Sequence, residues 1–265
     1  MGPIARSVGD LRLALRLLAG PDDRWWEVPP VPLEDPPGRS LQDLRIAWTD
    51  DFGGVPITAG TQAGLFELAA ALGQAGATVK RSFPQDFDLH VAWETFGELM
   101  SAETGSAMSP EAELARAETF GVGPEAGDPM ERGLLSGINA SMRLVTEART
   151  RRDSLIGAME RFLQDWDVLL CPVMPMPAPR HCDVGTPIDV DGHAVPYWTA
   201  GCYYTSPFNL TGQPVVVIPL TQSTEGLPIG VQVIGRRWGE MALLQIAEQL
   251  EELMGNCKCP TGYQH

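Results

Sequence analysis

The feature that most constrains the fold is an apolar run of four residues, VVVI at 215–218, between two prolines. A continuous apolar run bounded by turn-forming residues is typical of a strand that is buried on both faces. Such a strand needs a layer of helices on each side of its sheet. A second apolar stretch, 229–234, follows a connection rich in Ser, Thr and Gly. This pattern predicts an antiparallel hairpin inside a larger sheet.

Other segments predict the rest of that sheet and the helices that cover it. Two candidate strands, 44–48 and 77–82, flank a segment with helical apolar spacing at 61–75. The order strand, helix, strand predicts two parallel strands joined by a crossover helix. We therefore expect an α/β protein with a layered α/β/α architecture and a mixed β-sheet. Further elements are expected as helices at 86–104, 129–164 and 240–254 and as a strand at 168–173.

Three segments carry a resemblance to a known family. FNLTGQP (208–214), followed by the apolar run and by GLPIGVQVIG (226–235), resembles the C-terminal region of the amidase signature family. GPIARSV (2–8) is similar to a family segment that lies just downstream of the catalytic serines, and DVLLCPVMP (167–175) is similar to a strand that leads into a proline-rich turn. The resemblance implies the C-terminal part of a domain that hydrolyses the C–N bond of a small carboxamide, with no metal or organic cofactor.

The resemblance also implies where the catalytic groups lie. Family members use a lysine, kept neutral, that draws a proton through a bridging serine so that a second serine can attack the carbonyl. In the family these groups precede the segment that resembles GPIARSV, which begins here at residue 2. The chain has two lysines, Lys80 and Lys258, and neither is followed by a Gly/Ser-rich loop. We therefore expect no catalytic residue in this chain and expect the isolated chain to be inactive.

The residues just ahead of the FNLTGQP segment (208–214) supply the candidates for substrate binding. By the resemblance, Cys202, Tyr203, Tyr204 and Thr205 approach the substrate. In glutamine-using amidotransferase A subunits, the position of Cys202 resembles that of an aspartate that meets the substrate's ammonium group. A cysteine cannot form this ion pair, so a less polar amide is expected. The alternative interpretation is that both tyrosines belong to the core and that Cys202 only fills space.

Other kinds of site find little support in the sequence. Asp191-Gly192 between two short alternating arms predicts a hairpin turn rather than a calcium loop. Cys171 is expected to be a buried structural residue rather than a nucleophile activated by His181 and Asp183. The five cysteines lack the spacing of a disulfide framework, which indicates free thiols in a reducing compartment, and no metal site is expected.

The charge balance restricts the partners. The chain has 34 acidic and 19 basic residues, and its net charge of −15 disfavours nucleic acid and anionic membranes as partners. The sequence shows neither a signal peptide nor an apolar stretch of about 18 residues, so we expect a cytoplasmic protein. The expected partners are a small-molecule amide and either a missing N-terminal half or a second copy of the chain. A non-catalytic binding protein on an amidase scaffold and an incomplete gene product remain the alternatives.

The domain organisation follows from these elements. Residues 1–255 are expected to form one partial amidase-like domain. Within it, the proline-rich segment 22–40 is predicted to be a surface crossover whose Trp25 and Trp26 pack down onto the domain. Residues 109–128 are predicted to be a mobile helix-loop region, and residues 256–265 a flexible tail.

Overall fold

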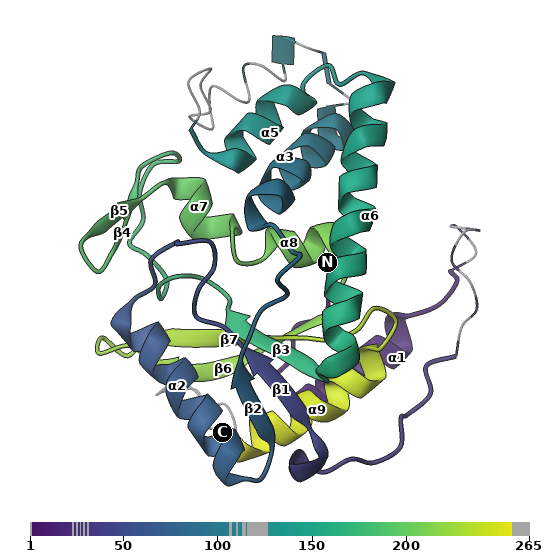
Figure 1. Ribbon diagram of the computed structural model, residues 1–265, viewed down its shortest axis with the longest axis vertical. Helices are drawn as coiled ribbons and strands as arrows, with labels where there is room; N and C mark the ends of the chain where they lie inside the picture. The colour runs from purple at the N-terminus through teal and green to yellow at the C-terminus, as the bar shows by residue number, and fades with distance from the viewer. Residues whose placement is uncertain are drawn as a thin grey trace.

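A five-stranded sheet lies at the centre of the computed structural model (Figure 1), which describes residues 2–22, 24, 26, 28, 30, 32–105, 108–109, 111–112, 115 and 127–255. The strand order is β2-β1-β3-β7-β6. β1 pairs with β2 and β3 in parallel, whereas β7 pairs antiparallel with β3 and β6. The mixed sheet is as expected. The five strands are β1 (Arg45–Trp48), β2 (Thr78–Arg81), β3 (Val168–Pro172), β6 (Val215–Gln222) and β7 (Pro228–Ile234).

Helices cover both faces of the sheet, so the predicted α/β/α layering is confirmed. One layer contains α2 (Ala59–Gln74) and α9 (Glu240–Met254), with α1 (Val8–Leu18) packed against α9. The other layer contains the long helix α6 and the helices beside it. Its members are α3 (Leu89–Gly105), α5 (Pro129–Gly137), α6 (Met142–Asp165), α7 (Tyr197–Cys202) and α8 (Ser206–Thr211). The remaining elements are η1 (Leu41–Asp43) and a hairpin of β4 (Ile188–Val190) and β5 (His193–Val195).

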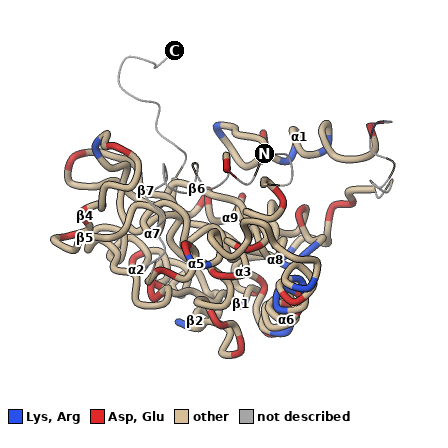
Figure 2. The backbone as a smooth tube through the Cα atoms, turned by 90° about the horizontal axis from the view of Figure 1, so that it is seen from above, with Lys and Arg blue, Asp and Glu red and all other residues tan. Residues whose placement is uncertain are grey.

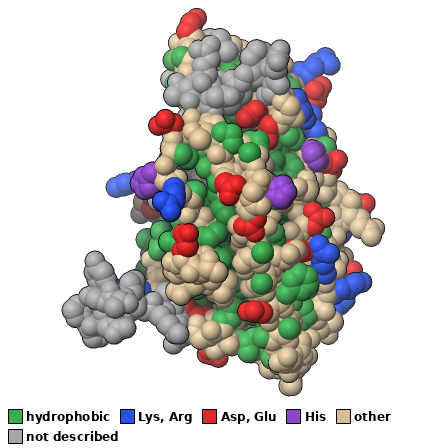
Figure 3. Space-filling model, turned by 90° about the vertical axis from the view of Figure 1, so that its left-hand side faces the viewer, with side chains coloured by type: hydrophobic (Ala, Val, Ile, Leu, Met, Phe, Trp, Pro, Cys, Tyr) green, Lys and Arg blue, Asp and Glu red, His purple; other side chains and the backbone are tan. Residues whose placement is uncertain are grey.

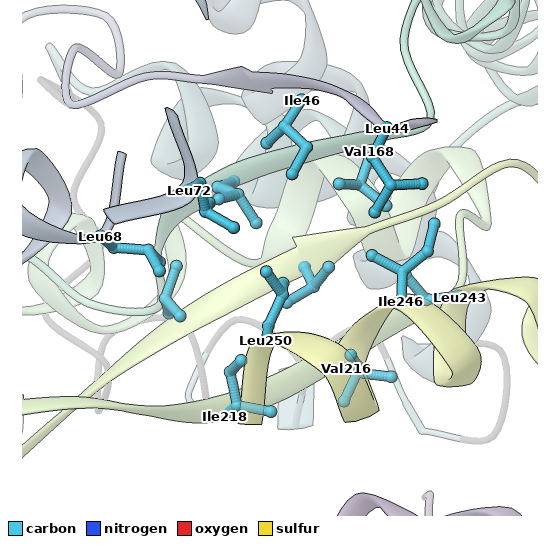
Figure 4. Packing of buried hydrophobic residues seen from close by; sticks show 14 of the residues in the cluster. Leu44, Ile46, Leu68, Leu72, Val168, Val216, Ile218, Leu243, Ile246 and Leu250 are labelled. Atoms are coloured by element: carbon cyan, nitrogen blue, oxygen red, sulfur yellow. The ribbon is translucent and has the colours of Figure 1, made fainter. Parts of the chain in front are cut away.

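The core between the sheet and the α2/α9 layer consists mainly of branched aliphatic side chains (Figure 4). Ile46 on β1 and Ile218 on β6 point into this layer, where Leu72 and Leu250 meet them from the helices. Complete burial of one such side chain stabilises the fold by roughly 1.5–3 kcal/mol. This layer therefore fixes α2 and α9 on one face of the sheet.

The prediction that residues 215–218 are buried on both faces is wrong. β6 is the last strand of the sheet, and its side chains alternate between burial and exposure. Val216 and Ile218 are 7% and 2% exposed, whereas Val217 between them is 52% exposed. β6 continues through Pro219, where the pairing with β7 shifts register. Proline is tolerated there because edge strands and bulges do not need its missing N–H.

The packing predicted for the two tryptophans of segment 22–40 needs correction. Trp26 is 86% exposed, so it does not pack onto the domain, and Trp25 lies outside the described residues. Ser7 caps α1, because its Oγ accepts a hydrogen bond from the Asp10 N–H at 3.1 Å. Leu18 of α1 is 72% exposed, whereas Leu11 and Leu15 of the same helix pack against the core. Most of segment 109–128 and all of 256–265 lie outside the described residues.

α3 and α5 cross at unusually close range because glycines line their contact. A Cβ atom placed on Gly133 of α5 would lie 2.1 Å from the carbonyl oxygen of Glu94. A Cβ on Gly97 of α3 would lie 2.4 Å from the carbonyl oxygen of Met130, and one on Gly137 would lie 2.5 Å from that of Glu98. Only hydrogen fits at these positions, so the backbones of the two helices touch directly.

Candidate functional site

The candidate substrate-binding residues form the junction between α7 and α8. α7 ends at Cys202, residues 203–205 connect the two helices, and α8 begins at Ser206. α8 stops after six residues because Gly212 adopts φ of 71°, and the Gly212 N–H donates to the Phe208 carbonyl at 2.8 Å. This left-handed position favours glycine. The FNLTG part of the motif thus makes a short helix with a fixed end.

Both tyrosines of the junction are core residues. Tyr203 is 2% exposed and stacks on Trp93 of α3, with ring centroids 4.0 Å apart. The indole Nε1–H of Trp93 also donates to the Tyr203 carbonyl at 3.0 Å. Tyr204 is 1% exposed and stacks on Phe52 at 4.7 Å. These contacts hold the junction firmly against the α3 side of the domain.

A buried amide ties the junction to the sheet. Gln232 on β7 is 2% exposed, and its Nε2 donates to the carbonyl oxygens of Tyr204 and Pro172, each at 2.9 Å. Buried carbonyl groups need such donors, since an unpaired one costs about 1–3 kcal/mol. The phenol of Tyr204 donates to the Val55 carbonyl at 3.3 Å. The backbone of the junction is therefore held from both the sheet and the loop after β1.

The thiol and the two phenols of the junction are uncharged at neutral pH, and one carboxylate, that of Asp128, lies beside Tyr203. Burial raises the pKa of the Cys202 thiol, which packs against the apolar cluster of this layer. Burial raises the pKa of both tyrosine phenols, and for Tyr203 the neighbouring Asp128 carboxylate adds to the effect. Asp128 itself caps α5, accepting from the Met130 N–H at 2.9 Å, and it accepts from the Thr199 hydroxyl at 2.8 Å. Its hydrogen-bonding capacity is thus directed at the helices, not at Cys202.

The four candidate residues differ in what they can offer a ligand. The side chains of Tyr203 and Tyr204 are buried, which agrees with the alternative interpretation that both tyrosines belong to the core. Cys202 and Thr205 are half-buried and adjacent, since the Thr205 hydroxyl donates to the Cys202 carbonyl at 3.2 Å. Substrate binding by these residues stays a prediction. Cys202 and Thr205 are the two whose side chains keep some accessible surface.

The residues weighed for nucleophilic chemistry are not assembled into a site in the described part of the chain. Lys80 is exposed on β2, at the edge of the sheet opposite β6, and no hydrogen bond or ion pair joins it to another described residue. Lys258 lies outside the described residues. Cys171 is fully buried with a raised thiol pKa, which confirms its structural character, whereas His181 is exposed.

Sequence reasoning missed a groove beside the same helix α8. We call it the β6 groove; its volume is about 760 Å³, and it lies between the N-terminal segment, α8, β6 and α9. The alternation of exposure along β6, which could have signalled it, is hidden because every residue of the VVVI run is apolar. The groove is lined by Gly2–Ala5, Leu11, Leu15, Phe208, Asn209, Gly212–Val217, Glu240, Leu243 and Leu244.

The charged groups are unevenly distributed. Basic residues gather along α6, which carries Asp and Glu as well, and further acidic residues are spread over the other elements (Figure 2). On the face that carries α2 and β4/β5, acidic and apolar side chains are interspersed, with basic and His side chains among them (Figure 3). Within the described residues, no group of three His, Cys, Asp or Glu side chains could hold a metal ion. No described helix is both long and apolar enough to cross a membrane.

Comparison with known proteins identifies the family. A family model described as Amidase matches residues 1–244. The chain belongs to the amidase family. Indoleacetamide hydrolase from Bradyrhizobium japonicum is 29% identical over 258 residues, which cover 96% of this chain and 52% of that protein. The 1-carboxybiuret hydrolase subunit AtzE from Pseudomonas sp. (strain ADP) is 28% identical, over 98% of this chain and 54% of that protein.

Solved structures agree on the fold. A bacterial aryl acylamidase of the amidase signature family has a TM-score of 0.72 at 21% identity, covering 95% of this chain and 52% of that one. A second amidase has a TM-score of 0.69 at 25% identity, covering 96% and 52%. The chain therefore spans about half the length of the relatives it matches.

Proposed function

We propose that this amidase-family chain forms the scaffold and part of the acyl-pocket wall for hydrolysis of a small, weakly polar carboxamide. In that reaction the amide C–N bond breaks, a C–O bond to the water oxygen forms, and the leaving nitrogen takes a proton. No metal or organic cofactor takes part. The observation that carries the proposal is the uncharged surface around Cys202 at the α7–α8 junction, which we call the neutral wall. The chain belongs to a family whose members include amide hydrolases.

The neutral wall favours one class of acyl group. Cys202 is half-buried against apolar side chains, and its thiol pKa is raised by burial. A substrate ammonium group placed there would lose water without gaining a counter-charge, at an effective cost of several kcal/mol. An aromatic or aliphatic acyl group pays no such penalty. We therefore assign apolar carboxamides, rather than glutamine, to this wall.

The nucleophile and base are proposed to come from outside the chain described here. Lys80 has no hydrogen-bonded serine among the described residues, and the matched relatives are about twice as long. A polypeptide that corresponds to the uncovered half of those relatives would complete the domain. The unpaired thiols of Cys171, Cys182 and Cys202 support a cytoplasmic, reducing location for this assembly.

Hydrolysis by the completed domain tests the proposal. The chain is co-expressed with the part of the Bradyrhizobium indoleacetamide hydrolase that it does not cover, and release of ammonia is followed with indoleacetamide and with glutamine. We expect hydrolysis of indoleacetamide at least ~100-fold faster than of glutamine, since a deficit of 2.7 kcal/mol is a factor of about 100. The chain alone should release no ammonia.

Cys202→Asp, with Cys202→Ala as its control, tests the role of the wall. Cys202→Asp should lower the ratio of the indoleacetamide rate to the glutamine rate, because it slows indoleacetamide hydrolysis. Cys202→Ala should leave that ratio unchanged. Faster hydrolysis of glutamine than of indoleacetamide by the unaltered domain would contradict the assignment. Hydrolysis of either amide by the chain alone would show that its own residues suffice.

A further inference from the structure

We propose that a cleft at the β2 edge of the sheet binds a small carboxylate that carries an aromatic ring. We call it the α6–β2 cleft; its volume is about 480 Å³, and it lies between the C-terminal part of α6, the first two strands and the loop after β2. It shares no lining residue with the α7–α8 junction. The proposal therefore goes beyond the proposed function.

The sheet and α6 build the cleft together. Arg45 begins β1, and Lys80 lies on β2 beside Ala47 of β1. Side chains alternate between the two faces of a strand, and Ala47 belongs to the core on the α6 side of the sheet. Arg45 and Lys80 therefore project on that side, where α6 faces them. β2 is the end strand of the sheet, so the cleft opens at the edge of the sheet.

The cleft gathers cations that lack strong partners. The described residues that line it include Arg45, Lys80 and Arg161. Lys80 forms no hydrogen bond or ion pair with another described residue, and the guanidinium of Arg45 lies 5.5 Å from the ring centroid of Trp166. Arg161 lies 3.8 Å from the carboxylate of Asp86, and both side chains are largely exposed. Exposed pairs of this kind are weak, so the three cations keep donors for an anion.

The charge of the lining fits a ligand with one negative charge. Asp86 and Asp165 are the acidic residues among the described residues of the cleft. Three cations and two carboxylates leave a net charge of +1, whereas the whole chain carries −15. A single carboxylate would neutralise this local charge, and a phosphate dianion would exceed it. Because an acidic chain repels anions elsewhere on its surface, the cleft stands out as a place that attracts them.

Aromatic rings form the apolar part of the wall. Phe83, Phe162 and Trp166 line the cleft, and each is half-buried. The ring centroids of Phe162 and Trp166 are 6.2 Å apart. A ligand ring can pack against such rings edge to face or in an offset stack. Small-molecule sites combine apolar walls with a few polar groups in volumes of about 300–1,000 Å³, and the cleft fits this description.

Phe52 separates the cleft from the α7–α8 junction. It is 0% exposed, and its ring centroid lies 5.7 Å from that of Phe83 and 4.7 Å from that of Tyr204. A ligand in the cleft therefore lies on a different side of this aromatic cluster from a ligand at the junction. The acid that the proposed hydrolysis would release belongs to the ligand class of the cleft. Its binding needs no catalytic group, so it can be measured on the chain alone.

Isothermal titration calorimetry with phenylacetate measures this binding. Phenylacetamide has the same ring without the charge, and acetate has the charge without the ring. Inorganic phosphate serves as a second anion without a ring. We expect phenylacetate to bind the unaltered chain at least tenfold more tightly than each of the other three compounds, because it alone uses both the cations and the rings.

Two variants with the same change in net charge locate the ligand. Lys80→Gln removes a cation of the cleft, whereas Arg149→Gln removes one from an exposed position of α6 that does not line the cleft. Lys80→Gln should weaken phenylacetate binding tenfold or more, and Arg149→Gln should leave it unchanged. Both side chains are exposed, so both variants should fold, and circular dichroism checks that they do.

Each contrary outcome overturns the proposal. No binding of phenylacetate by the unaltered chain does so, as does binding that Lys80→Gln weakens no more than Arg149→Gln. Equal affinity for phenylacetamide would show that the cations do not hold the ligand, and tighter binding of phosphate would show that the rings do not. Binding that Cys202→Asp weakens and Lys80→Gln does not would place the ligand at the α7–α8 junction. None of these results depends on ammonia release, so the cleft and the proposed function stand or fall separately.

Discussion

The crossing of α3 and α5 makes Gly133→Ala the sharpest test of the fold. The added methyl group would lie 2.1 Å from the Glu94 carbonyl oxygen, 2.9 Å from the Glu94 carbonyl carbon and 3.0 Å from the Glu98 nitrogen. All three atoms belong to the backbone of α3, so no side-chain rotation can relieve the contact. The two helices must move apart by about 1 Å to reach ordinary van der Waals separation.

The cost of that movement can be estimated. Overpacking a well-packed core costs about 1–3 kcal/mol, while replacement of a helical glycine by alanine returns up to about 1 kcal/mol of helix propensity. The backbone clash places Gly133→Ala at the upper end, so we expect a net loss of about 2 kcal/mol. For a domain of this size, 1 kcal/mol corresponds to a shift in Tm of roughly 2–4 °C. The variant should therefore unfold roughly 4–8 °C lower.

Differential scanning calorimetry with a matched variant checks the estimate. Gly73 lies near the end of α2, and a Cβ there meets nothing within 4 Å. Gly73→Ala should leave Tm unchanged or raise it slightly, because only helix propensity changes. Equal Tm values for the two variants would show that α3 and α5 are not in backbone contact, and the reasoning from the glycines would fail.

Two further predictions concern buried polar groups. Gln232→Leu leaves two buried carbonyl oxygens without their donor, so its free energy of unfolding in urea titration should fall by about 2–4 kcal/mol. The control variant Gln222→Leu, at the exposed end of β6, should change the free energy of unfolding by no more than about 0.5 kcal/mol. Equal losses in both variants would contradict the proposed role of the amide. In iodoacetamide labelling read by mass spectrometry, exposed Cys182 should react first, Cys202 more slowly and Cys171 only after unfolding. Burial raises the thiol pKa of Cys171 and Cys202, so at the pH of labelling a smaller fraction of each thiol is the reactive thiolate. Labelling of Cys171 as fast as that of Cys182 would refute this order.

Local patterns in the sequence were enough for much of the sheet. The predicted unit at 44–82 is the parallel pair β1 and β2 with α2 between them. The hairpin of β6 and β7 is also confirmed, as is the turn at Asp191-Gly192, where both residues have positive φ. These features depend on periodicity and turn chemistry within a few residues, which a sequence displays directly.

Other features depend on distant partners and could not be predicted. The VVVI run is apolar throughout, so its composition does not say which of its side chains a helix layer covers. Val216 and Ile218 face the α2/α9 layer, whereas Val217, which points to the other face of the sheet, is 52% exposed. α7 and α8 have six residues each, fewer than two turns, which is too short for a helical period to be read. The burial of Tyr203 depends on Trp93, which lies 110 residues earlier in the chain.

The open side of β6 also governs how the protein behaves in concentrated solution. No described strand pairs with the outer side of β6, and residues 215–218 carry no charge, so a neighbouring molecule can add its own strand there, the first step toward ordered aggregates. The excess of acidic residues keeps molecules apart, but this repulsion extends only about 10 Å at 0.1 M salt. Dilute, low-salt buffers should therefore keep the molecules apart, whereas added salt screens their repulsion and lets the β6 edges of two molecules meet.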